Sequence, residues 1–261
     1  MTTTVCDLLN KIITADTRWS CGSQNELKLS DGNNYFVYCD TTGFDKISVV
    51  GKAALITAGN GILISQWKKW WAGDANPANR PDTNKDGLNG INLAIVDLES
   101  NSVIFDAGQK QVLYCTISSE IKAFTSGSGA SHAASSLLIS GCAKKAVNYA
   151  SEHDHCTGSL VNFACYETDS NNLNKQVDDY DVIVQGIVQR GKIMTLNTSK
   201  PNEDGCDISM HPLANEIKSK FTSGQAVASA PVPGIENFQW TDETENRFQS
   251  AMERVHKLRN A

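Results

Sequence analysis

The first sixteen residues, MTTTVCDLLNKIITAD (residues 1–16), predict two short strands joined by a turn at Asn10–Lys11, with Asp16 at the end of the second strand. Removal of Met1 would make Thr2 the N-terminal residue. Such a threonine carries a nucleophilic hydroxyl and a base, its own α-amine, on one residue. The α-amine has a reference pKa of roughly 7.7–8.0, so a modest downward shift leaves much of it neutral at working pH. Thr2 is therefore a candidate nucleophile.

Composition is that of an ordinary globular protein. The chain has 261 residues, of which 40% are hydrophobic and 20% charged, enough for one large domain with a full core or one domain with an appendage. The net charge of −6, without long runs of like charge, gives no sign of a nucleic-acid partner. The apolar runs are too short to span a bilayer and no signal peptide precedes Thr2, so we expect a cytoplasmic protein without a membrane partner.

The eight cysteines are scattered without a C-x-x-C pair, which favours reduced thiols over a disulfide framework. His153 and His155 lie near Cys156, but the second pair of ligands that a tetrahedral zinc site needs is missing. The sequence therefore predicts no metal site and no cofactor.

Strand and helix patterns alternate along the rest of the chain. Two helices are expected, at 62–71 and from about 130 to between 149 and 153, with a polar loop at 72–90. Strands are expected at 35–39 and 157–166. Hairpins are expected at 46–61, with a turn at residues 51–52, at 91–98 with 102–105, and at 182–188 with 192–196. This mixture predicts sheets flanked by helical stretches.

The C-terminal part differs in character from the body. Glycines and prolines between residues 223 and 236 predict a flexible linker. Thr241 is expected to cap a helix of about 241–259, with Phe248, Met252 and Val255 along one face. We expect this helix to dock on the body or on a neighbouring subunit.

Further motifs suit the chemistry of an N-terminal threonine. Lys46 opens the hairpin of residues 46–61, and a positive charge near Thr2 would lower the pKa of its amine and hydroxyl. Gly127-Ser128-Gly129 precedes the small-residue helix, and Asp154-His155-Cys156-Thr157-Gly158 precedes a strand. Each is common alone, as a solvated lysine, a glycine-serine turn or an aspartate that closes a helix. Their order and spacing make the combination specific.

With this combination the chain resembles the N-terminal-nucleophile hydrolases of the proteasome β-subunit and HslV kind, closest to short bacterial and phage members. The resemblance covers residues 2 to about 196. It implies that Thr2 is the nucleophile, that Lys46 lies beside its hydroxyl, and that Asp16 holds the lysine in place.

The same resemblance implies roles for four more residues. Ser128 would approach the terminal amine, and Asp154 and Thr157 would hydrogen-bond around it. The backbone N–H of Gly59 would stabilise the oxyanion. The chain departs from the family in a longer stretch at 17–45 and in the absence of a second helix between residues 71 and 91.

The resemblance further implies an α+β fold, a four-layer αββα sandwich over residues 2–200, followed by a C-terminal extension over 201–261. The implied function is a threonine-type endopeptidase that acts on peptides or unfolded proteins inside a homo-oligomeric ring, with an ATP-driven unfoldase as partner by analogy. Two alternatives stay open: the same fold acting on small amides, and a non-catalytic structural subunit that keeps Met1.

Overall fold

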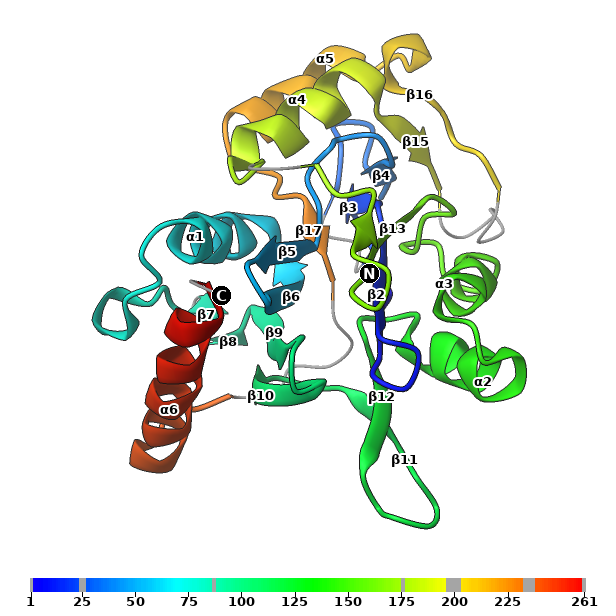
Figure 1. Cartoon of the computed structure of the whole chain (residues 1–261). Helices are drawn as coiled ribbons and strands as arrows, with labels where there is room; N and C mark the ends of the chain where they lie inside the picture. The colour runs from blue at the N-terminus through cyan, green and yellow to red at the C-terminus, as the bar shows by residue number, and fades with distance from the viewer. Residues whose placement is uncertain are drawn as a thin grey trace.

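Two antiparallel sheets dominate the computed structural model, which describes residues 2–23, 27–85, 88–174, 177–195, 203–231 and 238–259. The first sheet contains the predicted N-terminal hairpin at its centre, with Thr4 opposite Ala15 (Figure 1). Its strands, in spatial order, are β11 (Gln111–Tyr114), β12 (Ile121–Ser126), β1 (Thr4–Asp7), β2 (Ile12–Asp16), β13 (Val161–Cys165) and β14 (Ser170–Asn171).

The second sheet is longer and draws strands from both ends of the chain. Its strands, in spatial order, are β10 (Ser102–Ala107), β9 (Ile91–Asp97), β6 (Ala53–Asn60), β17 (Ser229–Ala230), β3 (Trp19–Cys21), β4 (Phe36–Cys39), β15 (Lys192–Met194) and β16 (Cys206–Asp207). Strand β5 (Ile47–Val50) also pairs with β6. A separate two-stranded ribbon joins β7 (Asn84–Lys85) to β8 (Leu88–Asn89).

Six α-helices lie in the described part of the chain. They are α1 (Gly61–Ala72), α2 (Ala130–Ser140), α3 (Ala143–Ser151), α4 (Tyr180–Arg190), α5 (Ala214–Thr222) and α6 (Asp242–Arg259). Two 3-10 turns, η1 (Pro77–Asn79) and η2 (Ile208–Met210), complete the elements. Helices α2 and α3 contact the first sheet, whereas α1, α4 and α6 contact the second (Figure 1).

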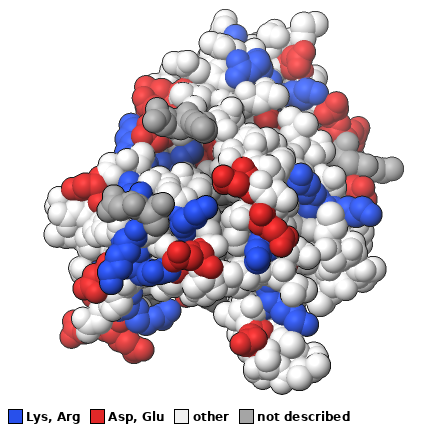
Figure 2. Space-filling view, in the orientation of Figure 1, with Lys and Arg blue, Asp and Glu red and all other residues white. Residues whose placement is uncertain are grey.

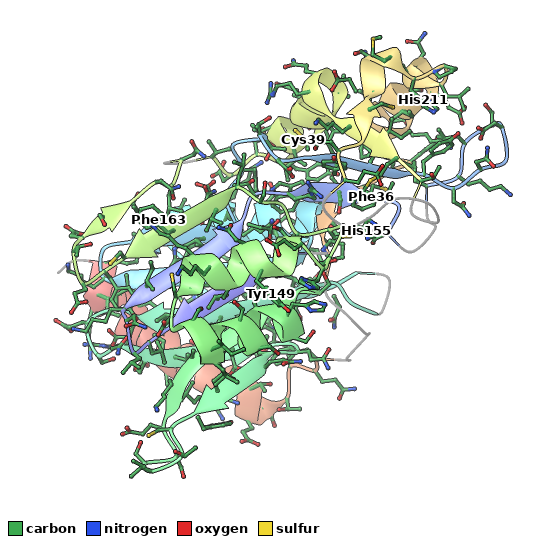
Figure 3. The ribbon with its side chains drawn as sticks, turned by 90° about the vertical axis from the view of Figure 1, so that its right-hand side faces the viewer. Phe36, Cys39, Tyr149, His155, Phe163 and His211 are labelled. Carbon is green, nitrogen blue, oxygen red and sulfur yellow. The ribbon has the colours of Figure 1, made fainter. Side chains whose placement is uncertain are left out.

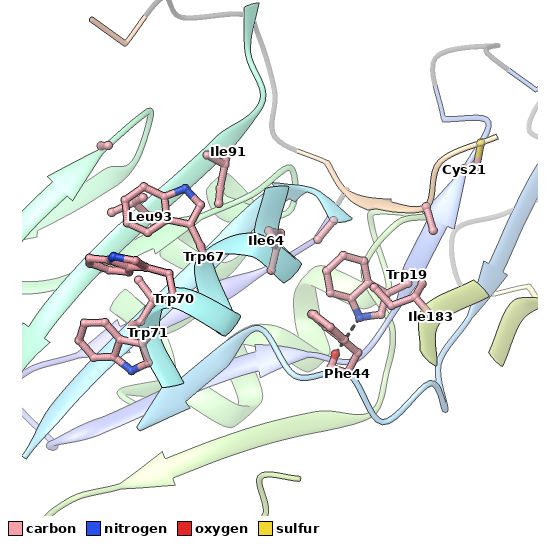
Figure 4. Packing of buried hydrophobic residues seen from close by; sticks show 14 of the residues in the cluster. Trp19, Cys21, Phe44, Ile64, Trp67, Trp70, Trp71, Ile91, Leu93 and Ile183 are labelled. Atoms are coloured by element: carbon pink, nitrogen blue, oxygen red, sulfur yellow. Dashed lines mark hydrogen bonds between the residues drawn. The ribbon is translucent and has the colours of Figure 1, made fainter. Parts of the chain in front are cut away.

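Buried apolar side chains form separate clusters that follow this arrangement. One cluster lies between the two sheets, where Ile13 and Phe124 of the first meet Ile56 and Val96 of the second. A second cluster joins the first sheet to α2 and α3. The largest joins the second sheet to its helices and contains most of the tryptophans (Figure 4). Within it, the indole N–H of Trp19 donates to the Phe44 carbonyl at 2.8 Å.

The structure corrects two of the predicted elements. Residues 182–188 belong to helix α4 and not to a hairpin, because Ile183, Gly186 and Ile187 are buried at helical spacing and the Asp179 side chain caps the first turn. The expected single helix after residue 130 is two helices, α2 and α3, since Gly141 adopts a left-handed conformation (φ 59°) and ends the first.

The C-terminal part is more closely joined to the body than a linker would be. Residues 226, 228 and 230 are buried alanines, and β17 is an internal strand of the second sheet. The predicted helix near residue 241 is α6, and it docks on the body through the buried Phe248, Met252 and Val255. The expected boundary near residue 200, and the expected linker at 232–236, lie outside the described residues.

Candidate functional site

Asp16, at the end of β2, is the centre of a buried polar group. Its side chain is fully enclosed and accepts hydrogen bonds from segments far apart in the sequence. The donors are the Arg18 N–H (2.9 Å) and Gly158 N–H (3.0 Å) to Oδ2, and the Thr3 N–H (2.8 Å), Thr2 hydroxyl and Lys46 ammonium (3.0 Å) to Oδ1. Five donors therefore fix this carboxylate in one orientation.

Lys46 lies just before β5 and is bound on all three of its N–H donors. Its Nζ donates to the Asp16 carbonyl (2.7 Å) and the Arg18 carbonyl (2.8 Å), and it pairs with Asp16 Oδ1. Burial lowers the pKa of Lys46, and the Asp16 carboxylate opposes that shift. An ammonium with three acceptors has no free proton site. Its contribution to chemistry at Thr2 is therefore positive charge and not proton abstraction.

Thr2 is 0% exposed and shares Asp16 Oδ1 with Lys46. Its carbonyl accepts the Gly129 N–H at 3.3 Å. Gly127, on the same turn, has φ +93°, and a Cβ there would meet the Thr2 carbonyl oxygen at 2.0 Å. The Gly-Ser-Gly turn thus lies directly against the Thr2 backbone, which explains why glycine is needed at that position.

Ser128, Asp154 and Thr157 form a second polar group next to the first. The hydroxyls of Ser128 (2.5 Å) and Thr157 (2.6 Å) both donate to Asp154 Oδ2. Thr157 Oγ1 also lies 2.8 Å from Thr3 Oγ1. Because the single proton of Thr157 goes to Asp154, the Thr3 hydroxyl is the donor in that pair. The Asp154 group is hydrogen-bonded to the N-terminal segment before β1 through Thr3 alone. The Asp16 group is hydrogen-bonded to the same segment through both Thr2 and Thr3.

Six of the seven candidate residues are therefore joined in one hydrogen-bonded network, and Gly59 is the exception. Within the described chain, no hydrogen bond links Gly59 to Thr2. Gly59 lies in β6, opposite Ile91 on one side and Ala230 of β17 on the other. Asn60 N–H donates to Gly90 (2.6 Å) and Gly61 N–H to Ala228 (3.2 Å). Since successive N–H groups alternate in direction along a strand, the Gly59 N–H points toward β17.

Arg18 is part of the site and was missed by the sequence analysis. Its guanidinium forms a two-pronged pair with the Asp40 carboxylate (2.7 and 2.8 Å) and donates to the His155 carbonyl (2.6 Å). Figure 3 shows His155 in the loop that follows α3, below the strand that carries Phe36. Arg18 therefore ties the loop of Asp154 and Thr157 to the second sheet. The sequence did contain a signal for Arg18, because this residue lies only two positions after the candidate residue Asp16.

No protein-family model matches this chain, and no curated protein sequence matches it. Among the described residues, no three His, Cys, Asp or Glu side chains gather as a metal site would need. No helix in the described ranges is both long and apolar enough to cross a bilayer.

Proposed function

We propose that this chain is a threonine-type endopeptidase of the N-terminal-nucleophile kind, with Thr2 as nucleophile once Met1 is removed. One observation carries the proposal: the Thr2 hydroxyl and the Lys46 ammonium share one oxygen of a buried, fully bonded carboxylate. A buried cation beside a threonine hydroxyl favours the alkoxide and the neutral amine, the two forms that attack needs. A buried ion pair often adds little net stability to a fold. Its presence beside Thr2 therefore favours a chemical role over a purely structural one.

The proposed reaction needs no group beyond this chain and water. The Thr2 α-amine takes the hydroxyl proton as Oγ1 bonds to the substrate carbonyl carbon, whose oxygen becomes an oxyanion. Collapse breaks the C–N bond, and the amine returns the proton to the leaving nitrogen. Water then attacks the carbonyl carbon of the Thr2 ester and gives a proton to the amine. The amine passes this proton to Oγ1 as the bond between Oγ1 and the acyl carbon breaks and the acid leaves. Asp16 and Lys46 supply charge, while Ser128, Asp154 and Thr157 orient the strand start.

The arrangement of the core supports a four-layer αββα sandwich, the finer fold that accompanies this function. One apolar cluster lies between the sheets, and each sheet has a further cluster against its own helices. The proposal extends to peptide or unfolded-protein substrates, a homo-oligomeric ring and, by analogy, an ATP-driven unfoldase in the cytoplasm.

The test is the intact mass of the purified chain before and after treatment with a peptide epoxyketone. This reagent forms its ring adduct only with a free N-terminal amine and a hydroxyl on the same residue. We expect loss of Met1 and one adduct per chain. Thr2→Ala should abolish the adduct, and Thr2→Ser should retain it.

Thr3→Ala is the matched control, because Thr3 belongs to the same network but lacks the terminal amine. It should still form the adduct, at a lower rate. A chain that keeps Met1 and forms no adduct would refute the proposal and favour a non-catalytic subunit. An adduct without cleavage of any peptide or casein, together with hydrolysis of small amides, would favour the small-amide alternative.

A further inference from the structure

Strand β17 lies in a gap between two strands that lead directly away from the site. Its Ser229 pairs with Ser20 of β3 on one side and with Asn60 of β6 on the other, antiparallel to both. Figure 1 shows this short segment between β3 and β6. The C-terminal part of the chain thus supplies one internal strand to a sheet whose neighbouring strands come from the first sixty residues.

The two strands that border this gap, β3 and β6, are both close to Lys46 in the structure. On one wall, the Arg18 carbonyl binds Lys46 Nζ, and β3 starts at the next residue. On the other wall, the Thr57 N–H binds the Lys46 carbonyl (2.9 Å), and Gly59 follows two residues later. Along the same edge of β6, strand β5 pairs with residues 53–56 and β17 with residues 59–60. The gap is therefore a one-strand slot that starts beside the candidate site.

The faces of β17 also relate it to the site. Residues 226, 228 and 230 are alanines buried in the cluster of the second sheet, together with Trp19 and Cys21. Since side chains alternate along a strand, Ser229 and Ser20 lie on the opposite face. On that face Phe36 and Tyr38 contact Cys156, the neighbour of Thr157. The Asp154–Thr157 loop therefore packs on this face of the sheet, next to the slot.

We propose that residues 226–231 occupy the peptide-binding slot of this protein and hold it closed, and that an extended peptide with small side chains at alternate positions takes their place. An extended peptide binds such a slot by adding a strand, with main-chain hydrogen bonds for affinity and side-chain pockets for specificity. The three buried alanines define pockets that accept small residues. The peptide nature of the ligand rests on the proposed function.

The position of Gly59 agrees with a closed slot. The Gly59 N–H, the expected oxyanion donor, points toward β17 and is covered by it. Departure of residues 226–231 would free that N–H for a substrate carbonyl.

The strand is also suited to being displaced. It has two residues, against eight in β6, and alanine and serine side chains offer little contact area. The Ala228 N–H donates to the Tyr180 hydroxyl (2.8 Å), a side-chain acceptor, and not to a backbone carbonyl of a neighbouring strand. A tethered strand nevertheless competes strongly with a free peptide, because its effective concentration is in the millimolar range. Weakening the tethered strand should therefore sharply raise the affinity for a peptide added in solution.

The experiment uses the full chain and the acetylated, fluorescently labelled hexapeptide AVASAP, the sequence of residues 226–231. Ser229→Pro removes an N–H from a central strand, where proline is not tolerated. Ser229→Ala keeps that N–H and is the matched control. We expect the proline variant to bind the peptide at least tenfold more tightly than the wild type and the alanine variant. Bound peptide should slow amide hydrogen exchange at residues 19–21 and 59–61.

A second variant, Ala228→Gly with Ala230→Gly, weakens the packing of β17 without removing a backbone N–H. If Ser229→Pro fails to fold, peptide binding to this variant tests whether β17 can be displaced. Unchanged affinity in a folded variant would overturn the proposal and make β17 a permanent strand. Epoxyketone labelling separates this inference from the proposed function. Tighter peptide binding by the variants without any adduct would support the peptide-binding slot and refute Thr2 as the nucleophile. An adduct whose rate is equal in all variants would support the nucleophile and count against a closed slot.

Discussion

Two buried lysines differ in what surrounds their charge. Lys46 has three acceptors, two backbone carbonyls and the Asp16 carboxylate, with which it forms an ion pair. Lys68, on α1, donates to the Asp45 carbonyl (2.8 Å) and lies 4.1 Å from the centre of the Phe44 ring. Both are almost fully enclosed. The difference in their partners makes them a natural pair for testing whether charge at the site, and not burial of any lysine, supports catalysis.

We expect Lys46→Met to lower the rate of epoxyketone labelling on the order of a hundredfold, the usual effect of removing one electrostatic contact from an active site. Lys68→Met should keep the rate within about twofold, because in the described part of the chain the Lys68 Nζ contacts the Asp45 carbonyl and the Phe44 ring and no member of the Asp16 network, and methionine fills a similar volume. Intact-mass time courses at one pH measure both. Equal losses in the two variants would mean that Lys46 acts only through stability.

Lys68 also predicts a pH dependence of stability. Burial lowers its pKa from 10.5 to about 8, while Asp45 and Asp178 oppose the shift. Between those two values the unfolded chain holds a proton on Lys68 that the folded chain has lost. The free energy of unfolding therefore rises with pH from about 8 to 10.5, by up to about 3 kcal/mol from this group.

Urea unfolding at intervals from pH 7 to pH 10 checks this contribution. The difference in free energy of unfolding between the wild type and Lys68→Met isolates the contribution of Lys68, because the lowered pKa of Lys46 acts equally in both proteins. The two proteins should differ least at high pH, with Lys68→Met the more stable at pH 7. Parallel stability curves would show that Lys68 is not titrating in this range.

At the scale of elements, α6 is held by aromatic packing. Phe248 is 0% exposed and contacts the rings of Trp67, Trp70, Phe105 and Trp240. Phe248→Ala should lower the free energy of unfolding by about 3–5 kcal/mol, since it leaves a cavity among rigid rings. Asn246→Ala, exposed on the same helix, should change it by less than about 0.5 kcal/mol. A small loss for Phe248→Ala in urea titrations would show that α6 is not part of the cooperative core.

The elements show which signals in the sequence are local. The N-terminal hairpin, β5–β6, α1 and α6 were predictable because apolar periodicity and turn residues act within each element. Helix α4 was missed because its β-branched residues favour strands, while its helical state depends on packing against the second sheet. Strand β17 could not be predicted, since its pairing partners lie more than 160 residues away. Order and spacing in the sequence selected six residues that the fold joins in one hydrogen-bonded network, whereas the contacts of Arg18 became visible only in the fold.

At the scale of the whole molecule, charge does not single out one face. Figure 2 shows acidic and basic side chains interspersed over the visible surface. Apolar exposure is more informative at the end of α2, where Leu138 and Ile139 are 71% and 89% exposed. The β1–β2 turn lies against this end, because the Asn10 side chain donates to the Gly141 carbonyl (3.3 Å). The exposed Leu9 belongs to the same turn, so we call Leu9, Leu138 and Ile139 the apolar edge.

If the proposed ring forms, the apolar edge is a surface that it would bury, because exposed aliphatic side chains gathered in one region of a surface mark interaction sites. Light scattering of the wild type should then give a mass well above that of the 28.3 kDa chain. Leu138→Glu with Ile139→Glu should reduce it to the monomer without lowering the midpoint of urea unfolding. Ile117→Glu, 95% exposed on the β11–β12 turn, is the control and should leave the mass unchanged. A monomeric wild type would refute the ring and favour an open enzyme that acts on small amides.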